Sequence, residues 1–284
     1  MITFSTLKKQ LPLFTFLILL FVAGCSSTST LQHPTTSATL WVQNAAEYKA
    51  LTTSVYQTAT NNLSMALEDS YWTASPKQED SSLRELPPAI ILDVDETVLD
   101  NSPFQARMIK QNSSFNLQQW NAWVREANAN AVPGAVEFTQ QAAEQGVEIF
   151  YLTNREAKVE EATRKNLREL GFPLDEDEDR ILSNHERENW TSAKTERRAH
   201  VAKNHRIIML FGDDLNDFIS AKGISQQQRD ELVVANNNRW NRSWYILPNP
   251  VYGSWENALY NFDDSLSSAQ KDSAKKARLN PKQN

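Results

Sequence analysis

Short runs of consecutive apolar residues alternate with longer amphipathic segments along this chain of 284 residues. Apolar runs bounded by turn residues are typical of buried strands, whereas apolar residues at intervals of three and four are typical of helices. The runs that we expect to form strands are 89–92, 147–152, 181–182 and 207–211, and a further apolar segment covers 244–247. Predicted helices separate these runs, and this alternation indicates an α/β fold with a mostly parallel sheet.

The segment before the first predicted strand is mainly helical. Between residues 41 and 66 apolar side chains recur every three or four positions, which predicts one long amphipathic helix. Residues 104–130 are also mainly helical and carry Trp120 and Trp123. Residues 25–38 are rich in Ser and Thr and predict a flexible tether, and residues 265–284 form a polar tail.

Composition adds three limits to this interpretation. Hydrophobic residues make up 40% of the chain and include eight tryptophans, which is enough for the core of one large domain. The formal net charge is −6 and no basic stripe runs along the chain, so we expect no nucleic acid partner. Cys25 is the only cysteine, which excludes an intrachain disulfide and a cysteine-based zinc site.

Residues 1–24 have the composition of a targeting segment. Lys8 and Lys9 precede an apolar run over 11–22, and small residues then lead to Cys25. The segment resembles a bacterial lipoprotein signal peptide, which implies cleavage before Cys25 and lipid attachment to that residue. An ordinary secretory signal with an incidental cysteine is the alternative.

Three of the predicted strands end in polar residues that can carry chemistry. These residues are Asp93 and Asp95 after the first strand, Thr153 and Asn154 after the second, and Asp213, Asp214 and Asp217 after the strand at 207–211. Ligands of parallel sheets bind beyond the carboxyl ends of the strands, so we expect one shared site. Two carboxylates ~4 Å apart repel by about 4 kcal/mol at an effective dielectric constant near 20. Such a site needs a cation, and an all-oxygen donor set favours Mg²⁺.

Mg²⁺ in proteins commonly accepts a phosphate oxygen as well, which predicts a phosphorylated substrate. The Thr153 hydroxyl and the Lys194 ammonium group are suited to bind phosphate. One aspartate can attack phosphorus and form an aspartyl-phosphate. A second carboxylate two residues further on can protonate the leaving oxygen and then activate water. Because Arg197 and Arg198 follow Lys194, a solvated surface position for that lysine is the alternative.

In combination, these motifs resemble those of the haloacid dehalogenase (HAD) superfamily. Residues 93–97 are similar to its first motif, 152–155 to its second, Lys194 to its third and 212–217 to its fourth. The segments 95–103, 133–138 and 248–255 resemble, more narrowly, the class C bacterial acid phosphatases, which are outer-membrane lipoproteins of the 5′-nucleotidase type. The resemblance extends from about residue 41 to residue 262.

This resemblance implies an α/β, HAD-like Rossmannoid core over 39–264, with a smaller helical cap from about 39–70, 98–130 and the C-terminal segment. It implies that Asp93 is the nucleophile and Asp95 the general acid and base. The other roles that it implies are Mg²⁺ binding by Asp93, the Asp95 carbonyl and Asp213; phosphate binding by Thr153, Asn154 and Lys194; support by Asp214 and Asp217; and substrate stacking by Trp120 and Tyr252.

The expected activity is Mg²⁺-dependent hydrolysis of phosphomonoesters, in particular nucleoside monophosphates and related aromatic phosphates. The alternatives are a non-catalytic lipoprotein that binds a ligand on the same fold, and a phosphotransferase that uses an alcohol in place of water. The resemblance also implies a lipid-anchored cell-envelope protein, in the outer membrane and facing the periplasm; a homodimer stays open. The family often has Asn where this chain has Asp214 and Tyr where it has Phe104.

Overall fold

The structure is a computed structural model that describes residues 33–78, 81–175 and 178–282. The chain divides into two units, Met1–Gln32 and His33–Asn284, and all of the described residues belong to the second unit. The predicted signal peptide over 1–24 and the predicted lipidation site Cys25 therefore lie outside the described residues, as does most of the predicted tether.

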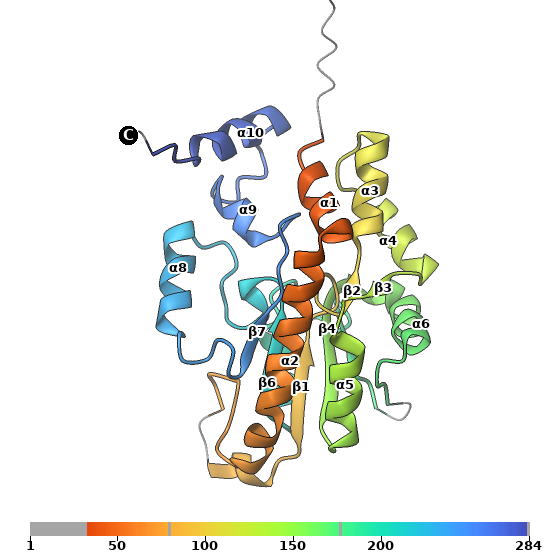
Figure 1. Cartoon of the computed structure of the whole chain (residues 1–284), viewed down its shortest axis with the longest axis vertical. Coiled ribbons are helices and arrows are strands. Elements are labelled where there is room, and N and C mark those ends of the chain that lie inside the picture. Colours follow the sequence, from red (N-terminus) through yellow and green to blue (C-terminus); the bar gives the residue numbers. More distant parts are fainter. Residues whose placement is uncertain (1–32, 79–80, 176–177, 283–284) are drawn as a thin grey trace, which may run out of the picture. The chain divides into compact units, whose positions relative to one another are not determined.

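A five-stranded sheet forms the centre of the second unit (Figure 1). Its strands are β1 (Pro88–Leu92), β4 (Glu148–Glu156), β5 (Ile181–Asn184), β6 (Arg206–Gly212) and β7 (Trp244–Ile246). They lie in the order β5-β4-β1-β6-β7, and every neighbouring pair is parallel. The predicted α/β fold is confirmed. Because β1 lies between β4 and β6, the carboxyl ends of the three strands that carry the motifs are adjacent.

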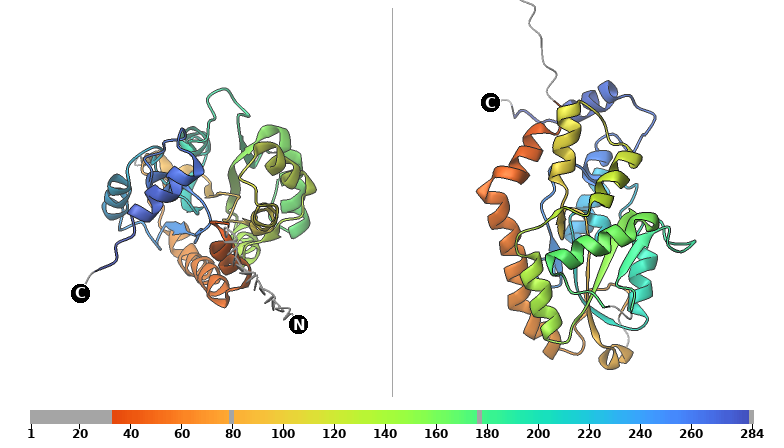
Figure 2. Two further views of the ribbon diagram at one scale, coloured as in Figure 1. Left: turned by 90° about the horizontal axis from the view of Figure 1, so that it is seen from above. Right: turned by 90° about the vertical axis from the view of Figure 1, so that its right-hand side faces the viewer.

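Helices connect the strands and cover both faces of the sheet. The helices are α1 (Thr36–Asn44), α2 (Ala46–Glu68), α3 (Ser102–Gln111), α4 (Leu117–Glu126), α5 (Ala135–Glu144), α6 (Glu160–Leu170), α7 (Thr195–Ala202), α8 (Gln226–Ala235), α9 (Ser254–Ala258) and α10 (Ser268–Ala277), with 3₁₀ turns η1 (Ser81–Glu85), η2 (Ala157–Val159) and η3 (Leu215–Asp217). In Figure 2, α2 and α5 lie on one face of the sheet and α7 lies on the other.

Alternate residues of β1 point to two separate hydrophobic clusters. Ile90 and Leu92 pack in the cluster that contains Tyr56 of α2, whereas Ile91 packs in the cluster that contains Val201 of α7. Successive side chains of a strand point to opposite faces, so a strand covered on both faces must be apolar at every position. This is why β1 and β6 are continuous apolar runs and not alternating ones.

A small helical insertion follows β1. Strand β2 (Leu99–Asp100) pairs antiparallel with β3 (Asn130–Ala131), and α3 and α4 lie between them in the chain. Helix α1 packs against α3, while α2 packs against α5 beside the sheet. The insertion falls within the range predicted for the cap, and α1 adds to it from the N-terminal side.

The prediction of one long N-terminal helix is wrong. The chain forms α1 and α2, with a break at Ala45, whose backbone is extended (φ −75°, ψ 129°). Because of the break, α1 packs against α3 of the insertion, while α2 packs beside the sheet. The ring centroids of Trp41 and Tyr48, on either side of the break, lie 5.5 Å apart. In addition, α1 begins at Thr36, inside the segment that the sequence assigned to a flexible tether.

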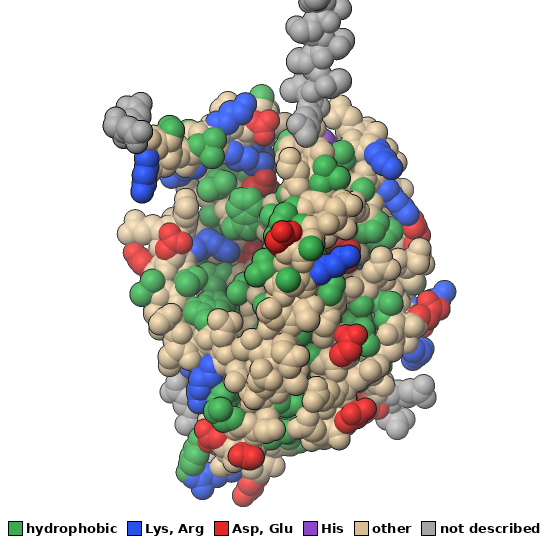
Figure 3. Space-filling model, in the orientation of Figure 1, with side chains coloured by type: hydrophobic (Ala, Val, Ile, Leu, Met, Phe, Trp, Pro, Cys, Tyr) green, Lys and Arg blue, Asp and Glu red, His purple; other side chains and the backbone are tan. Residues whose placement is uncertain are grey.

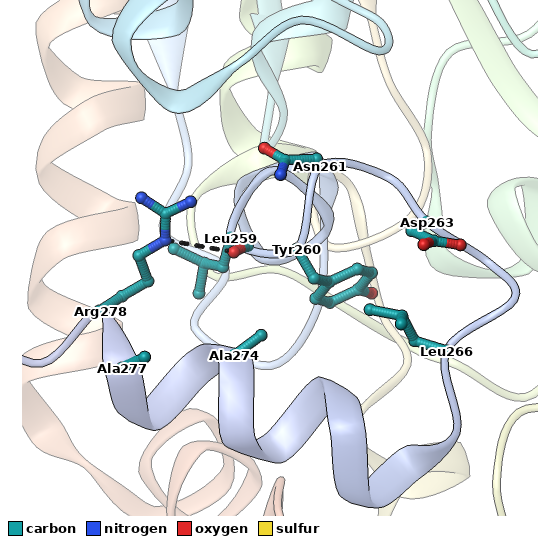
Figure 4. A pocket seen from close by; sticks show the side chains of 8 residues that line it. All are labelled: Leu259, Tyr260, Asn261, Asp263, Leu266, Ala274, Ala277 and Arg278. Carbon is teal, nitrogen blue, oxygen red and sulfur yellow. Dashed lines mark hydrogen bonds between the residues drawn. The ribbon is translucent and has the colours of Figure 1, made fainter.

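The C-terminal segment predicted as a polar tail contains a helix, α10. Ser267 caps this helix through a capping box with Gln270, and no residue of α10 is buried. A cavity of about 530 Å³ separates α10 from the turn that follows α9; Leu259, Tyr260, Leu266 and Ala274 are among its lining residues (Figure 4). Helix α10 therefore packs loosely on the rest of the unit.

The surface shows no concentration of one charge on the face drawn in Figure 3, where acidic and basic side chains are interspersed. A basic stripe of the kind that binds nucleic acid is not visible on that face. Within the ranges that the structure describes, no helix combines the length and the apolar character needed to cross a membrane.

Candidate active site

Three carboxylates meet at the carboxyl ends of β1 and β6. Asp93 directly follows β1, Asp213 directly follows β6, and Asp217 lies in η3; one oxygen of each lies within 4.8 Å of the others. The Asp93 backbone N–H donates to the Phe211 carbonyl at 3.0 Å, so the β1–β6 ladder continues past the last strand residue. Strand pairing therefore brings two acidic segments together that are about 120 positions apart in the sequence.

The placement of Asp217 depends on Gly212. A Cβ atom added at Gly212 would overlap the Cβ and the carboxylate of Asp217. The loop also folds Asp217 back toward its own start, because the Asp214 backbone N–H donates to Asp217 Oδ2 at 3.0 Å. Because glycine has no side chain, Asp217, the last aspartate of the fourth motif, can turn into the cluster with Asp93 and Asp213.

Lys194, immediately before α7, neutralises part of this cluster. Its ammonium Nζ contacts Asp93 Oδ1 and lies 2.6 Å from Asp217 Oδ1. The side chain of Lys194 is only 4% exposed, so the alternative of a solvated surface lysine is wrong. Burial alone would lower the pKa of Lys194, but the charges of Asp217 and Asp93 together raise it above its usual value. Lys194 therefore stays cationic.

One lysine does not compensate three carboxylates. Burial raises the pKa of Asp93 to about 7; Lys194 opposes this shift, while Asp217 and Asp95 add to it. Burial, followed by the charges of Asp93 and Asp217, raises the pKa of Asp213 well above its usual range. Asp213 is also oriented by the Asn249 amide, which donates to its Oδ2 at 2.7 Å. A cluster of oxygen donors short of positive charge fits a hard divalent cation held by Asp93, Asp213 and Asp217.

Asp95 belongs to a second network beside this cluster. Its Oδ1 accepts hydrogen bonds from Arg155 Nε and from Asn101 Nδ2, both at 2.9 Å. Its Oδ2 accepts from the Thr153 hydroxyl at 3.4 Å. Two short hydrogen bonds thus hold one carboxylate oxygen, while the contact to the other oxygen is longer.

Thr153 and Asn154 lie at the end of β4 with different surroundings. Thr153 is fully buried beside Asp95, whereas the side chain of Asn154 is exposed. The Asn154 Oδ1 accepts from Arg197 Nη2 at 2.6 Å, and its Nδ2 donates to the Ser192 carbonyl at 3.2 Å. The predicted phosphate-binding segment is therefore held from the side of α7.

Sequence reasoning gave Arg155 and Arg197 no individual role. Arg155 directly follows Asn154, which was a weak signal. Arg197 and Arg198 follow Lys194 at positions i+3 and i+4, and this spacing places all three cations on one side of α7. That periodicity was the available signal for a buried role.

Asp214 caps the loop and does not join the three carboxylates. Its Oδ1 accepts from the Asn216 N–H at 3.0 Å and its Oδ2 from the Ser254 N–H at 2.7 Å. Burial would raise the pKa of Asp214, but these two amides and Arg229 together lower it. Asp214, which stands where the family often has Asn, therefore holds η3 against the start of α9.

The two predicted stacking residues flank the first motif. Trp120 packs edge-on against Phe104 at 5.1 Å between ring centroids, and the guanidinium group of Arg155 lies 5.6 Å from its ring. The Tyr252 hydroxyl donates to Glu96 Oε1 at 3.0 Å. Burial, with the charges of Asp100 and Asp95, raises the pKa of Glu96 to about 8. Glu96, which sequence reasoning left without a role, therefore connects Tyr252 to the catalytic loop.

The parallel sheet, the helical insertion after β1, the three motifs at the adjacent ends of β1, β4 and β6, and Lys194 before α7 define a HAD-type fold and site. The chain belongs to the acid phosphatases of HAD superfamily subfamily IIIB, whose family model matches residues 23–255. It is similar to the class C acid phosphatase from Bacillus anthracis, with 35% identity and a TM-score of 0.77 over 88% of this chain and 98% of that one. A structure of that phosphatase with tungstate bound gives a TM-score of 0.78 at the same identity and coverage.

More distant similarity extends to plants. The chain is 28% identical over 166 residues to Acid phosphatase 1 of Solanum lycopersicum. It is 24% identical over 167 residues to the stem 28 kDa glycoprotein of Glycine max. The matched region spans 57% and 58% of the length of these two relatives.

Proposed function

We propose that this protein is a Mg²⁺-dependent acid phosphatase that hydrolyses phosphomonoesters through an aspartyl-phosphate at Asp93. The preferred substrates are nucleoside monophosphates and related aromatic phosphates. The observation that carries the proposal is the cluster of Asp93, Asp213 and Asp217, in which the buried Asp93 and Asp217 both contact Lys194. A tetrahedral oxyanion, tungstate, is bound in a structure of the Bacillus anthracis relative, which supports an oxyanion site in this chain.

The first half of the reaction is assigned to Asp93 and Asp95. An oxygen of Asp93 attacks phosphorus, and the bond between phosphorus and the ester oxygen breaks. Asp95 donates the proton that the leaving alcohol needs, through Oδ2, because Arg155 and Asn101 occupy Oδ1. Lys194 and the Thr153 hydroxyl stabilise the negative charge on the phosphoryl oxygens.

In the second half, Asp95 takes a proton from water. The water oxygen bonds to phosphorus, the acyl-phosphate P–O bond breaks, and inorganic phosphate leaves with Asp93 restored. Mg²⁺ held by Asp93, Asp213 and Asp217 or the Asp95 carbonyl would neutralise these carboxylates and polarise a phosphoryl oxygen. The buried position of the cluster strengthens each of these electrostatic contributions.

Preference for aromatic phosphates is supported by the positions of Trp120 and Tyr252. Trp120 lies beside Arg155, which donates to Asp95. The Tyr252 hydroxyl donates to Glu96, the residue that follows Asp95. Flat rings stack on aromatic side chains with little regard to their substituents, so the expected selectivity among nucleobases is broad.

The test is hydrolysis of p-nitrophenyl phosphate by the full chain, with and without EDTA. We expect EDTA to abolish turnover and excess Mg²⁺ to restore it. The variant Asp93→Asn should lose about 10⁴-fold or more in kcat. Asp264→Asn is the matched control, since Asp264 is fully solvated. Undiminished turnover by Asp93→Asn would refute the nucleophile, and metal-independent turnover would refute the cofactor.

Two further measurements separate the alternatives and the substrates. Nucleoside monophosphates should give a higher kcat/KM than glycerol phosphate. Transfer of phosphate to an added nucleoside, in place of release to water, would identify a phosphotransferase. Ligand binding without any turnover would identify a non-catalytic protein.

A further inference from the structure

Three cations lie on the side of α7 that faces the candidate site: Lys194 immediately before the helix, and Arg197 and Arg198 in its first turn. Lys194 contacts the carboxylate cluster, and Arg197 and Arg198 follow it at positions i+3 and i+4. Arg197 is fully buried and forms no ion pair with a carboxylate among the described residues, which is rare for an arginine. Its Nη1 and Nη2 atoms find other acceptors, while the buried Nε has no hydrogen-bond partner among the described residues.

Four hydrogen bonds from Arg197 join three segments of the chain. Its Nη1 donates to the carbonyls of Thr153 and, at 3.1 Å, Leu182. Its Nη2 donates to Asn154 Oδ1 at 2.6 Å and to the Thr191 carbonyl at 2.8 Å. Strands β4 and β5 and the loop before α7 are thus joined by the Arg197 side chain.

These contacts fix the orientation of the peptide between Thr153 and Asn154. The described part of the chain contains no cis peptide bond, so the carbonyl and the N–H of this peptide point in opposite directions. Because Arg197 holds the Thr153 carbonyl, it also directs the Asn154 N–H away from itself. The Asn154 amide group, tied to Arg197 and Ser192, cannot turn freely either.

We propose that Arg197 is a positioning residue that sets the Thr153–Asn154 peptide for binding the phosphoryl group. This inference rests on the proposed phosphatase function. Arg197 then controls the affinity for phosphate, whereas Lys194 and Arg198 support the carboxylate cluster.

Lysine cannot replace Arg197 in this role. A guanidinium group presents donors in a planar fork, whereas an ammonium group is a single point that cannot reach four separated acceptors. Burial lowers the pKa of Arg197 to about 10, which still leaves the group cationic at neutral pH.

Arg198 provides an internal comparison on the same helix. Its Nη1 donates to the carbonyls of Asn216 at 2.8 Å and Asp217 at 3.1 Å, and therefore supports the fourth motif. Loss of Arg198 should disturb the metal-binding carboxylates, while loss of Arg197 should disturb phosphate binding. The two arginines thus predict different defects.

The experiment measures two affinities by calorimetry on the full chain: Mg²⁺ alone, and inorganic phosphate in the presence of saturating Mg²⁺. We expect Arg197→Lys to weaken phosphate binding by about tenfold or more, the loss of one or two charge-assisted hydrogen bonds. Its Mg²⁺ affinity should stay within about twofold of that of the unaltered protein, since Arg197 touches none of the three carboxylates. Arg198→Lys should weaken Mg²⁺ binding, and the exposed Lys203→Gln should change neither affinity.

A second variant covers a failure of Arg197→Lys to fold. Arg197→Ala with added guanidinium ions should regain phosphate affinity as the ion fills the vacated site. Unchanged phosphate affinity in Arg197→Lys, or an equal fall of both affinities, would overturn the inference. Because phosphate binding is measured without turnover, an inactive but phosphate-binding protein would refute the proposed function and leave the role of Arg197 to be decided by these variants.

Discussion

At the scale of single residues, the site is held by one ammonium group between two carboxylates. Lys194 lies between Asp93 and Asp217, and all three side chains are less than 8% exposed. Removing one partner of a buried ion pair leaves an uncompensated charge, which costs more than the pair contributes. The structure therefore makes Lys194 important for stability as well as for chemistry.

We expect Lys194→Gln to lower the free energy of unfolding in EDTA by about 3 kcal/mol, because two buried carboxylates then lack a counter-charge. The same variant should lose about 10²-fold or more in kcat with Mg²⁺ present. Urea denaturation and p-nitrophenyl phosphate turnover measure the two effects. Lys203→Gln, an exposed position at the end of the same helix, is the control. A variant at 194 as stable and active as the control would contradict this account of the cluster.

The sequence predicted the strand ends at which acidic residues gather, but it did not separate Asp214 from the three carboxylates that meet, nor did it predict which residues hold them. Asp93, Asp213 and Lys194 stand directly after apolar runs or in recognisable motifs, so their convergence follows from the parallel sheet. Arg197 donates mainly to backbone carbonyls, and a carbonyl leaves no signature in the sequence. Glu96 pairs with Tyr252, which is 156 positions away, and no local pattern reports such a contact.

At the scale of elements, the strands were predictable because their apolar runs are buried on both faces. The break between α1 and α2 was not predictable, since Ala45 is a good helix former and the apolar period continues across it. Tertiary packing causes the break, because α1 contacts α3 of the insertion and α2 contacts α5 and β7. The polar composition of residues 265–284 also did not indicate helix α10, because a capping box can start a helix there without the burial of any residue.

Removal of residues 267–284 should leave catalysis and stability nearly unchanged. The removed segment contacts the rest of the unit through the ion pair of Lys275 with Glu256, through Lys271 over the Tyr260 ring at 5.0 Å, and through a hydrogen bond from Arg278 Nε to the Leu259 carbonyl at 3.3 Å beside the cavity (Figure 4). Exposed ion pairs of this kind contribute about 0–1 kcal/mol each. Thermal denaturation and kcat/KM of the truncated chain test this expectation. A fall of the melting temperature by more than about 5 °C would show that α10 is part of the cooperative unit.

At the scale of the whole molecule, the proposed location depends on the N-terminal segment. Residues 1–24 resemble a lipoprotein signal, and Cys25 is the only cysteine available for a thioether-linked lipid. We propose that the mature protein is anchored by this lipid in the cell envelope, in the outer membrane facing the periplasm. Cleavage of phosphate esters there would release nucleosides that cross membranes more readily than their phosphates.

Cys25→Ser should release the protein from the membrane fraction without changing its turnover number. The thiol is the only group in the variant that differs, and a single site of lipid attachment is lost with it. Cell fractionation followed by a phosphatase assay of each fraction measures this. Membrane association that survives in Cys25→Ser would point to an uncleaved apolar segment over 11–22 as the anchor.

Gly212 extends this reasoning to the relatives of the chain. Any side chain at this position would occupy the space in which Asp217 turns toward Lys194. A related protein with a larger residue at the equivalent position must have displaced or abandoned its fourth-motif aspartate. One glycine therefore offers a criterion for surveying genomes: it separates family members that have kept a working phosphatase from degenerate copies that have kept only the scaffold.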